Sequence, residues 1–130
     1  MIRVCCLQFG VSDKMSGIKL QYFDHRLRGE PIRLLLAYGG FQYEDERVAL
    51  PWEDAKPWLA LKPSMTWGQL PCLTWTTGDR LFQSMAICRF LAREIGIAGD
   101  TSLEMAQVDE VIDALQDAIN SNVSQFHHQF

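Results

Sequence analysis

The chain has 130 residues, of which 48% are hydrophobic and 22% charged, as in one globular domain with some residues left over. This composition excludes collagen, mucin-like stalks and wholesale disorder. Twelve basic and 16 acidic residues give a net charge of -4, so we expect no nucleic-acid partner. The longest apolar runs are far shorter than the roughly 20 residues of a membrane-spanning helix, so we expect no membrane partner.

The cysteines indicate a reducing compartment. Cys5 and Cys6 are adjacent, and Cys72 and Cys88 are isolated. Neighbouring cysteines rarely bridge each other, and no Cys-x-x-Cys spacing or Cys/His quartet for a metal occurs, so we expect a reduced, cytoplasmic protein without a metal site. The first residues make a poor signal peptide, and Met15 begins what looks like an alternative start, so residues 1–17 are predicted to be an extension outside the fold.

The first half of the fold is predicted from its periodicity. Apolar and polar residues alternate over 18–23, which predicts a strand that ends near Tyr22. Residues 30–40 carry an early proline and end in paired glycines, as in a helix. Residues 43–48 can form a second strand, and their charges favour the edge of a sheet. Residues 51–59 are predicted to hold a short helix at most, because Pro57 lacks an N–H.

The next segment has the pattern of a hairpin followed by a helix. Residues 70–76 and 80–82 flank a turn at 77–79, and 83–94 carry apolar residues at helical spacing before Gly96. Two strands joined through a helix pair in parallel by a right-handed crossover, whereas the hairpin is antiparallel. The prediction is an α/β thioredoxin-like domain over 18–98, with a mixed four-stranded sheet.

A further helix is predicted near the C-terminus. Thr101-Ser-Leu-Glu104 is a capping box, and Met105, Val108, Ile112, Leu115 and Ile119 then share one face. This helix is amphipathic and needs partners that the remaining residues do not provide. We therefore expect residues 99–130 to be the first helix and tail of a truncated all-helical domain.

Five motifs occur in a recognisable order: Tyr22-Phe23, Arg28-Gly-Glu30-Pro-Ile-Arg33, Trp52 with Lys56, Gly68-Gln-Leu-Pro71, and Gln83-Ser-Met-Ala-Ile-Cys-Arg-Phe-Leu91. Together, over roughly residues 18–120, they resemble a glutathione transferase of the sigma class. The resemblance implies glutathione as co-substrate, an electrophilic small molecule as second substrate, and a homodimer. It also implies a helical domain that provides most of the second-substrate pocket.

The resemblance gives Tyr22 and Arg28 the catalytic roles. A phenol stays neutral at pH 7 and can donate a hydrogen bond that stabilises the glutathione thiolate, and a nearby arginine favours the same anion. Each residue also has a plain structural interpretation. The ring of Tyr22 can pack in the sheet with its hydroxyl in water, and Arg28 can be a solvated surface residue.

The remaining motifs are expected to bind the rest of glutathione. Leu70-Pro71 matches a cis-proline turn whose backbone pairs with the tripeptide, and the start of a helix at Gln83 and Ser84 suits the γ-glutamyl carboxylate. Trp52 and Lys56 match the pair that closes over the glycine carboxylate, although one residue is missing before Trp52. Gln69 stands where relatives often have lysine or arginine.

The last helix is expected to act across a dimer. By resemblance, Asp113 meets the ammonium of glutathione bound to the other subunit, and Asp109 can join a carboxylate cluster that attracts a divalent cation in some relatives. Two other functions stay open: a non-catalytic or crystallin-like relative that binds glutathione, and a glutathione-dependent isomerase of the prostaglandin D synthase type. A glutaredoxin-like exchanger is set aside because Tyr22 occupies the region where such a protein needs a reactive cysteine.

Overall fold

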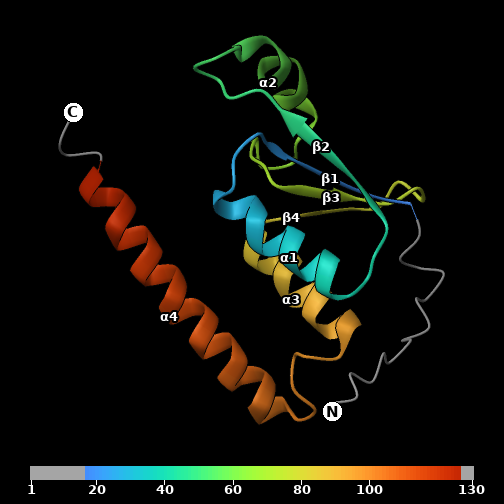
Figure 1. The fold of residues 1–130 in the computed structure, drawn as a ribbon, viewed down its shortest axis with the longest axis vertical. Coiled ribbons are helices and arrows are strands. Elements are labelled where there is room, and N and C mark those ends of the chain that lie inside the picture. Colours follow the sequence, from blue (N-terminus) through green and yellow to red (C-terminus); the bar gives the residue numbers. More distant parts are fainter. Residues whose placement is uncertain (1–16, 127–130) are drawn as a thin grey trace, which may run out of the picture. The chain divides into compact units, whose positions relative to one another are not determined.

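A computed structural model describes residues 17–126 of the chain (Figure 1). Residues 1–16, which make up nearly all of the expected N-terminal extension, lie outside the described residues, as do 127–130. The chain divides into two compact units, the first ending at Leu91 and the second beginning at Ala92. Each unit is described by itself.

The first unit contains a mixed four-stranded sheet, as predicted. Its strands are β1 (Ile18–Phe23), β2 (Tyr43–Val48), β3 (Cys72–Thr74) and β4 (Arg80–Phe82). They lie in the order β2-β1-β3-β4, with β2 parallel to β1 and the two other pairings antiparallel. The parallel pair joined through a helix and the antiparallel hairpin confirm the thioredoxin-like arrangement.

The core lies between the sheet and two helices, α1 (Glu30–Tyr38) and α3 (Ser84–Ile95). Alternation along β1 buries Ile18, Leu20 and Tyr22, while the residues between them are half-buried. Figure 1 shows α1 and α3 side by side on one side of the sheet. The fully buried side chains come from all of these elements: Leu20, Cys72, Leu73, Ile32, Leu36, Ile87 and Leu91.

Helix α1 begins and ends as its sequence predicts. A 3-10 turn, η2 (Leu27–Gly29), leads into it, and Pro31 lies in the first helical turn, where a missing N–H has no cost. Gly39 caps the last turn, and Gly40 follows with a φ of 69°, a left-handed conformation that glycine adopts without strain. Helix α1 therefore stops at the paired glycines, and the chain turns back into β2.

Helix α2 (Ala55–Leu61) starts later and runs further than the predicted 51–59 segment. Asp54 caps it by accepting a hydrogen bond from the backbone N–H of Lys56 at 3.0 Å. Pro57 is then the third helical residue, where the backbone N–H has no intrahelical acceptor in any helix. Proline is tolerated there, so the helix passes through Lys56-Pro57 and continues into the 3-10 turn η3 (Lys62–Ser64).

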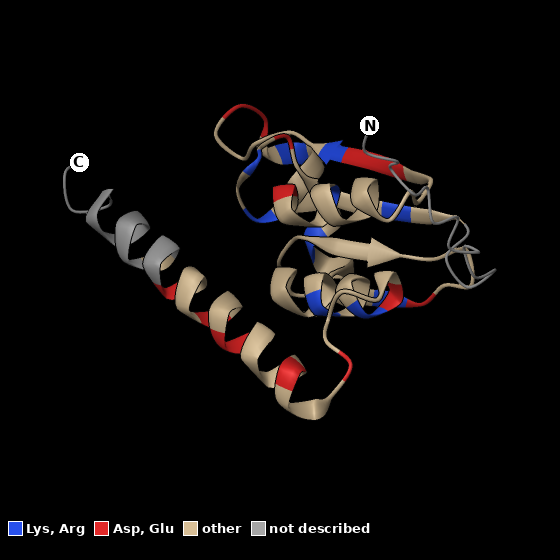
Figure 2. Cartoon of the chain, turned by 60° about the horizontal axis from the view of Figure 1, so that its bottom comes forward, with Lys and Arg blue, Asp and Glu red and all other residues tan. Residues whose placement is uncertain are grey.

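The second unit consists mainly of the helix α4 (Ser102–Phe126). Its capping box forms as predicted: Thr101 Oγ1 accepts from the N–H of Glu104 at 3.2 Å, and Glu104 Oε2 accepts from the N–H of Thr101 at 3.0 Å. The described part of α4 carries acidic residues and no Lys or Arg (Figure 2). Among the described residues, no helix is both long and apolar enough to cross a membrane.

Candidate functional site

A cleft of about 430 Å³ opens where β1 ends. Its lining comes from the end of β1 and the turn after it, from α2 and η3, from the loop before β3, and from the start of α3. The lining residues are Phe23, Arg28, Trp58, Lys62, Gly68, Gln69, Leu70, Pro71, Gln83 and Ser84. Segments far apart in the sequence therefore meet at one end of the sheet.

The cleft carries positive charge although the chain as a whole is acidic. Arg28 and Lys62 are among its ten lining residues, and none of the ten is Asp or Glu. The net charge of the chain is -4. Cationic side chains attract an anionic group of a ligand and repel a cationic one, so this lining favours the binding of an anionic group.

Tyr22 lies just behind the cleft. Its side chain is only 5% exposed, and its neighbours Phe23 and Arg28 line the cleft while Tyr22 itself does not. The backbone N–H of Arg28 donates a hydrogen bond to Tyr22 Oη at 3.3 Å. An oxygen that accepts from an N–H directs its own O–H elsewhere, so the phenol retains its capacity to donate.

The ring of Tyr22 is fixed from two sides. Gly29 packs against it so closely that a Cβ at this position would collide with Cδ1 and lie 2.8 Å from Cγ. On α1, the guanidinium carbon of Arg33 lies 5.9 Å from the centroid of the Tyr22 ring, within the range of a cation–π contact. These contacts leave the ring little freedom to turn.

Arg33 itself is a buried cation, with 8% of its surface exposed. Its Nε donates to both carboxylate oxygens of Asp45, at 3.1 and 3.2 Å, and its Nη1 donates to the carbonyl of His25 at 3.0 Å and to Glu30 at 3.3 Å. Arg33 thereby ties α1 to β2 and to the turn that precedes Arg28. The motif that contains Arg33 was identified in the sequence, but its burial was not predicted.

Trp58 and Lys62 line the cleft, whereas Trp52 and Lys56 do not. Trp52 is 77% exposed, and Lys56 is exposed in the first turn of α2. Trp58 packs edge-on against Phe23, with 5.2 Å between ring centroids, and Lys62 Nζ lies 6.0 Å from the indole centroid.

The sequence contained a signal for this second pair. Trp58 and Lys62 repeat the spacing of Trp52 and Lys56, but they lie six residues closer to the Gly68-Gln-Leu-Pro71 motif. If Pro57 is interpreted as a helix breaker, the predicted helix ends by residue 59, and Lys62 falls outside it. The helix that crosses Pro57 carries Trp58 to the cleft, and Lys62 follows at the first position of η3.

The remaining sequence-predicted residues of the first unit meet at the cleft. The Leu70–Pro71 bond is cis, as expected. Gln83 adopts a φ of 71°, a conformation that is uncommon for residues other than glycine, and its Nε2 donates to Gln69 Oε1 at 3.4 Å. Ser84 is buried at the start of α3. Backbone strain of this kind is concentrated at functional sites.

Asp109 and Asp113 belong to the second unit. Both lie on α4, Asp109 half-buried and Asp113 exposed, and their expected roles stay predictions. Among the described residues, no group of three or more His, Cys, Asp or Glu side chains is arranged to hold a metal ion.

The two described cysteines do not have the properties of a nucleophile. Cys72 is fully buried in β3, and Cys88 is buried in α3. Burial raises the pKa of the Cys88 thiol to about 11, an effect that the nearby charge of Arg89 only partly offsets. A thiol with such a pKa stays protonated at neutral pH, so Cys88 does not offer a thiolate for disulfide exchange. Cys72 is 0% exposed and is therefore out of reach of a disulfide substrate.

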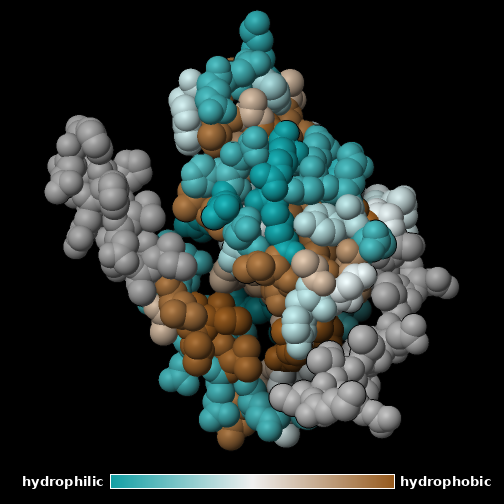
Figure 3. Space-filling model, viewed as in Figure 1, coloured by the Kyte–Doolittle hydropathy of each residue, from teal (hydrophilic) through white to brown (hydrophobic). Residues whose placement is uncertain are grey.

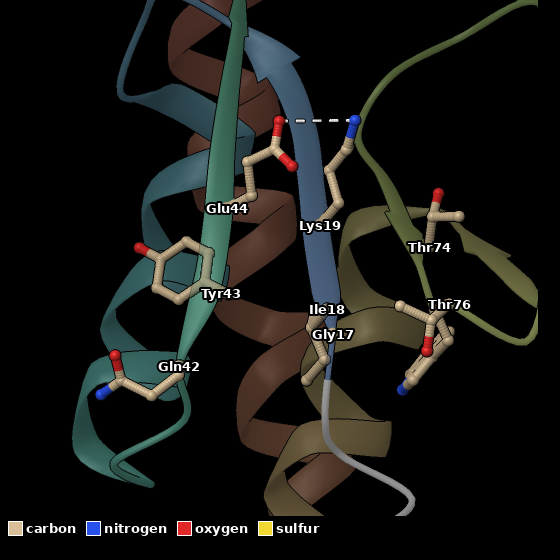
Figure 4. A pocket seen from close by; sticks show the side chains of 9 residues that line it. Gly17, Ile18, Lys19, Gln42, Tyr43, Glu44, Thr74 and Thr76 are labelled. Carbon is tan, nitrogen blue, oxygen red and sulfur yellow. Dashed lines mark ion pairs between the residues drawn. The ribbon is translucent and has the colours of Figure 1, made fainter.

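A second hollow, of about 510 Å³, lies at the opposite end of β1 (Figure 4). Lys19 points into this region, but it already forms ion pairs with Glu44 at 3.4 Å and Glu46 at 3.0 Å. The other lining residues are uncharged: Gly17, Ile18, Gln42, Tyr43, Thr74, Trp75 and Thr76. This hollow therefore has an acidic residue, Glu44, in its lining, whereas the lining of the cleft at Phe23 contains no Asp or Glu.

Comparisons with known proteins agree with this geometry. Residues 18–93 match the family model described as "Glutathione S-transferase, N-terminal domain". Glutathione S-transferase 4 of Caenorhabditis elegans is 43% identical over 105 residues, which cover 81% of this chain and 48% of that protein. Hematopoietic prostaglandin D synthase of Gallus gallus is 41% identical over 103 residues, 79% of this chain and 49% of that protein.

A solved structure gives the same result. The glutathione S-transferase from Ascaris lumbricoides superposes with a TM-score of 0.76 at 41% identity, covering 85% of this chain and 51% of that one. The chain thus spans about half the length of the relatives it matches. The family model covers more than half of the chain, and the fold is that of the solved relative. The chain therefore belongs to the glutathione S-transferase family.

Proposed function

We propose that this protein binds glutathione in the cleft at Phe23 and activates its thiol for attack on an electrophilic small molecule. Glutathione is the co-substrate of the family, and it carries two carboxylates, one ammonium and one thiol. One observation supports the proposal most directly. The cleft has Arg28 and Lys62 in its lining and no acidic residue, and the Tyr22 hydroxyl lies directly behind it.

The chemical task is to ionise the sulfur. A free thiol has a pKa near 8.5, so only a few per cent is thiolate at pH 7. A hydrogen bond from the phenol of Tyr22 to the thiolate contributes about 1.5 to 3 kcal/mol, equivalent to roughly one to two pKa units of the bound thiol. Arg28 adds a positive charge on the same side. The proton leaves to solvent, and the sulfur lone pair then forms the new C–S bond as the leaving group departs with its own electron pair.

The other lining residues hold the tripeptide. Leu70 offers its backbone N–H and C=O to the peptide of glutathione, and Gln83 with Ser84 presents the start of α3 to the γ-glutamyl carboxylate. We assign the glycine carboxylate to Trp58 and Lys62 rather than to Trp52 and Lys56, because only the former pair lines the cleft. Gln69 supports Gln83 through their side-chain hydrogen bond.

The finer assignments belong to the same proposal. The order of the motifs supports the sigma class, and the two buried free thiols, Cys72 and Cys88, suit the cytoplasm. Homodimerisation, with Asp113 reaching the glutathione of the partner subunit, rests on the resemblance. The relatives are about twice as long as the matched segment, so the identity of the electrophile is left to the experiment.

The test is a calorimetric titration with glutathione, combined with a conjugation assay on a chlorodinitrobenzene-type substrate. Micromolar-to-millimolar binding together with turnover supports the proposal. Binding without turnover indicates a non-catalytic relative. A folded sample that does not bind glutathione rejects the proposal.

A further inference from the structure

The hollow at the start of β1 is formed by three neighbouring strands. Because β1 and β2 are parallel and β3 is antiparallel to β1, the starts of β1 and β2 meet the end of β3 at one end of the sheet. The lining residues are 17–19, 42–44 and 74–76, and the volume is about 510 Å³. Ligand pockets span roughly 300–1,000 Å³, so this hollow is large enough to hold several side chains.

The lining of the hollow offers aromatic surface. Tyr43 and Trp75 both line it, and both are half-buried. Trp75 also packs edge-on against Phe90 of α3, with 5.5 Å between the ring centroids, which holds the indole in place. A fixed aromatic ring buries a large apolar area when another side chain covers it. The hollow therefore suits an apolar segment of polypeptide.

The rim of the hollow is acidic on the side of β2. Glu44 lines the hollow, and Glu46 follows two residues later in β2, where Figure 3 shows hydrophilic surface. Lys19 is shared between these two carboxylates, at 3.4 Å from Glu44 and 3.0 Å from Glu46. The side chain of Glu44 is 64% exposed. One lysine between two carboxylates leaves a net negative charge, which attracts a cation.

The 16 residues before Gly17 have a composition that complements this hollow. They carry one acidic and two basic residues, Asp13, Arg3 and Lys14, for a net charge of +1 in a chain whose net charge is -4. Segments that do not fold against a surface are typically poor in apolar residues. Seven of residues 1–9 are apolar: Met1, Ile2, Val4, Cys5, Cys6, Leu7 and Phe9.

Gly17 connects this segment to the hollow, because Gly17 is itself a lining residue. Figure 4 shows Gly17 and Ile18 between Gln42 on one side and Thr76 on the other. Gly17 has a φ of 65°, a left-handed conformation that glycine adopts without strain, and a Cβ at this position would collide with the side chain of Thr76. The chain therefore changes direction at the wall of the hollow and does not continue the straight line of β1.

We propose that residues 1–16 dock in this hollow, with apolar side chains of residues 1–9 against Tyr43 and Trp75 and with Arg3 beside Glu44. An extended chain spans at most about 3.6 Å per residue, so the 14 residues from Arg3 to Gly17 reach up to about 50 Å, which is ample for a return to the hollow.

Covalent attachment at Gly17 makes this segment a better occupant than a free molecule. Docking is intramolecular, and a short flexible connection gives an effective concentration in the millimolar range. A second copy of this chain, or a small molecule present at lower concentration, has to displace the attached segment. The observations therefore favour residues 1–16 over either alternative.

The test is disulfide capture in the full 130-residue chain. The segment contains Cys5 and Cys6, whereas the described cysteines, Cys72 and Cys88, are buried. Gln42→Cys introduces a thiol at an exposed position of the lining, outside any helix or strand. Mild oxidation with copper phenanthroline, followed by peptide mapping with mass spectrometry, measures how fast the introduced thiol is bonded to the segment.

Two variants serve as matched controls. Tyr38→Cys introduces a thiol that is outside the lining but only four residues from Gln42, at a position that is 73% exposed, so the segment reaches both positions. We expect capture by Gln42→Cys to be at least fivefold faster. Adding Leu7→Asp and Phe9→Asp to Gln42→Cys removes apolar side chains from the segment without changing its length. We expect these two changes to lower the rate to that of Tyr38→Cys.

Four results overturn the proposal: equal capture at the two positions, no capture by a folded Gln42→Cys chain, capture only between two chains, or a rate that Leu7→Asp with Phe9→Asp leaves unchanged. The hollow and the cleft at Phe23 lie at opposite ends of β1, so the glutathione titration should be the same in all of these variants. A failure to bind glutathione therefore rejects the proposed function and leaves this inference in place.

Discussion

The backbone N–H of Arg28 and the hydroxyl oxygen of Tyr22 lie 3.3 Å apart in a hydrogen bond that spans six residues of sequence. This bond connects the end of β1 to the turn before α1, and it fixes the position of the phenol oxygen without using its proton. The same turn places the Arg28 side chain in the wall of the cleft. One short turn therefore orients both groups that we assign to the sulfur.

Replacing Tyr22 with phenylalanine tests the role of the hydroxyl. The ring and its packing remain, but the bond to the thiolate is lost, which corresponds to about 10- to 30-fold less ionised glutathione at pH 7, where a few per cent of a free thiol is already ionised. We expect turnover to fall by about this factor while the calorimetric affinity for glutathione stays within a few-fold. The ultraviolet mercaptide band of bound glutathione should shrink in parallel. Equal turnover in the two proteins contradicts the assignment.

Gly29→Ala should damage the site through the position of Tyr22. The added methyl collides with the Tyr22 ring, and such overpacking of a core costs about 1–3 kcal/mol. Turnover should fall further than this loss of stability explains, because the ring is displaced. Gly40→Ala is the control: its Cβ has open space but an unfavourable φ of 69°, so it should lower stability by about 1 kcal/mol and leave turnover unchanged.

Lys62→Met and Lys56→Met form a matched pair that separates the two assignments of the carboxylate site. A charge-assisted hydrogen bond contributes about 1.5–3 kcal/mol, so Lys62→Met should weaken glutathione binding by roughly 10- to 100-fold. Lys56 does not line the cleft, and its variant should bind within twofold of wild type. If Lys56→Met weakened binding and Lys62→Met did not, the titration would instead favour Trp52 and Lys56 as the pair that binds the glycine carboxylate.

The sequence was sufficient to predict the fold because local signals and tertiary structure agree. Period-2 alternation placed β1, the proline and paired glycines bounded α1, and Thr101 with Glu104 started α4. Each of these signals acts over a few residues. None depends on a distant partner.

The features that were missed depend on position within an element or on distant contacts. Proline breaks a helix interior but is tolerated at the third helical residue, and this distinction decides whether a helix can carry Trp58 to the cleft. The burial of Arg33 depends on Asp45, which is adjacent only because β2 returns beside β1.

Arg33→Met tests whether the buried guanidinium stabilises the fold by connecting α1 to β2 and to the turn before Arg28. Removing one partner of a largely buried ion pair costs about 3–5 kcal/mol, because the remaining charge stays desolvated. We expect denaturant unfolding to show a loss at or below the lower end of this range, since Asp45 is partly exposed and keeps its ion pair with Arg47 Nε at 2.9 Å. Lys19→Met is the control. Its pairs with Glu44 and Glu46 are solvent-exposed and should contribute less than about 1 kcal/mol.

The capping box of α4 should make the stability of that helix depend on pH. Hydrogen bonds from the backbone N–H groups of Asp100 and Thr101 hold the pKa of Glu104 below its ordinary value of 4.5. A carboxyl whose pKa is lower in the folded than in the unfolded state binds fewer protons when folded, so its stabilisation is present above the unfolded pKa. That stabilisation disappears as the pH falls through the folded pKa.

We therefore expect Glu104→Gln to lower amide protection in the first turn of α4 at pH 7 and to have no effect once the carboxyl is protonated. Glutamine keeps an acceptor oxygen but removes the charge, so the comparison isolates the ionised form. Glu110→Gln, which removes one charge from the middle of the same helix, controls for net charge. A difference between wild type and Glu104→Gln that grew as the pH fell would have the wrong sign for a carboxylate stabilised by N–H donors and would contradict the prediction. A difference that did not change with pH would show that Glu104 acts through packing alone.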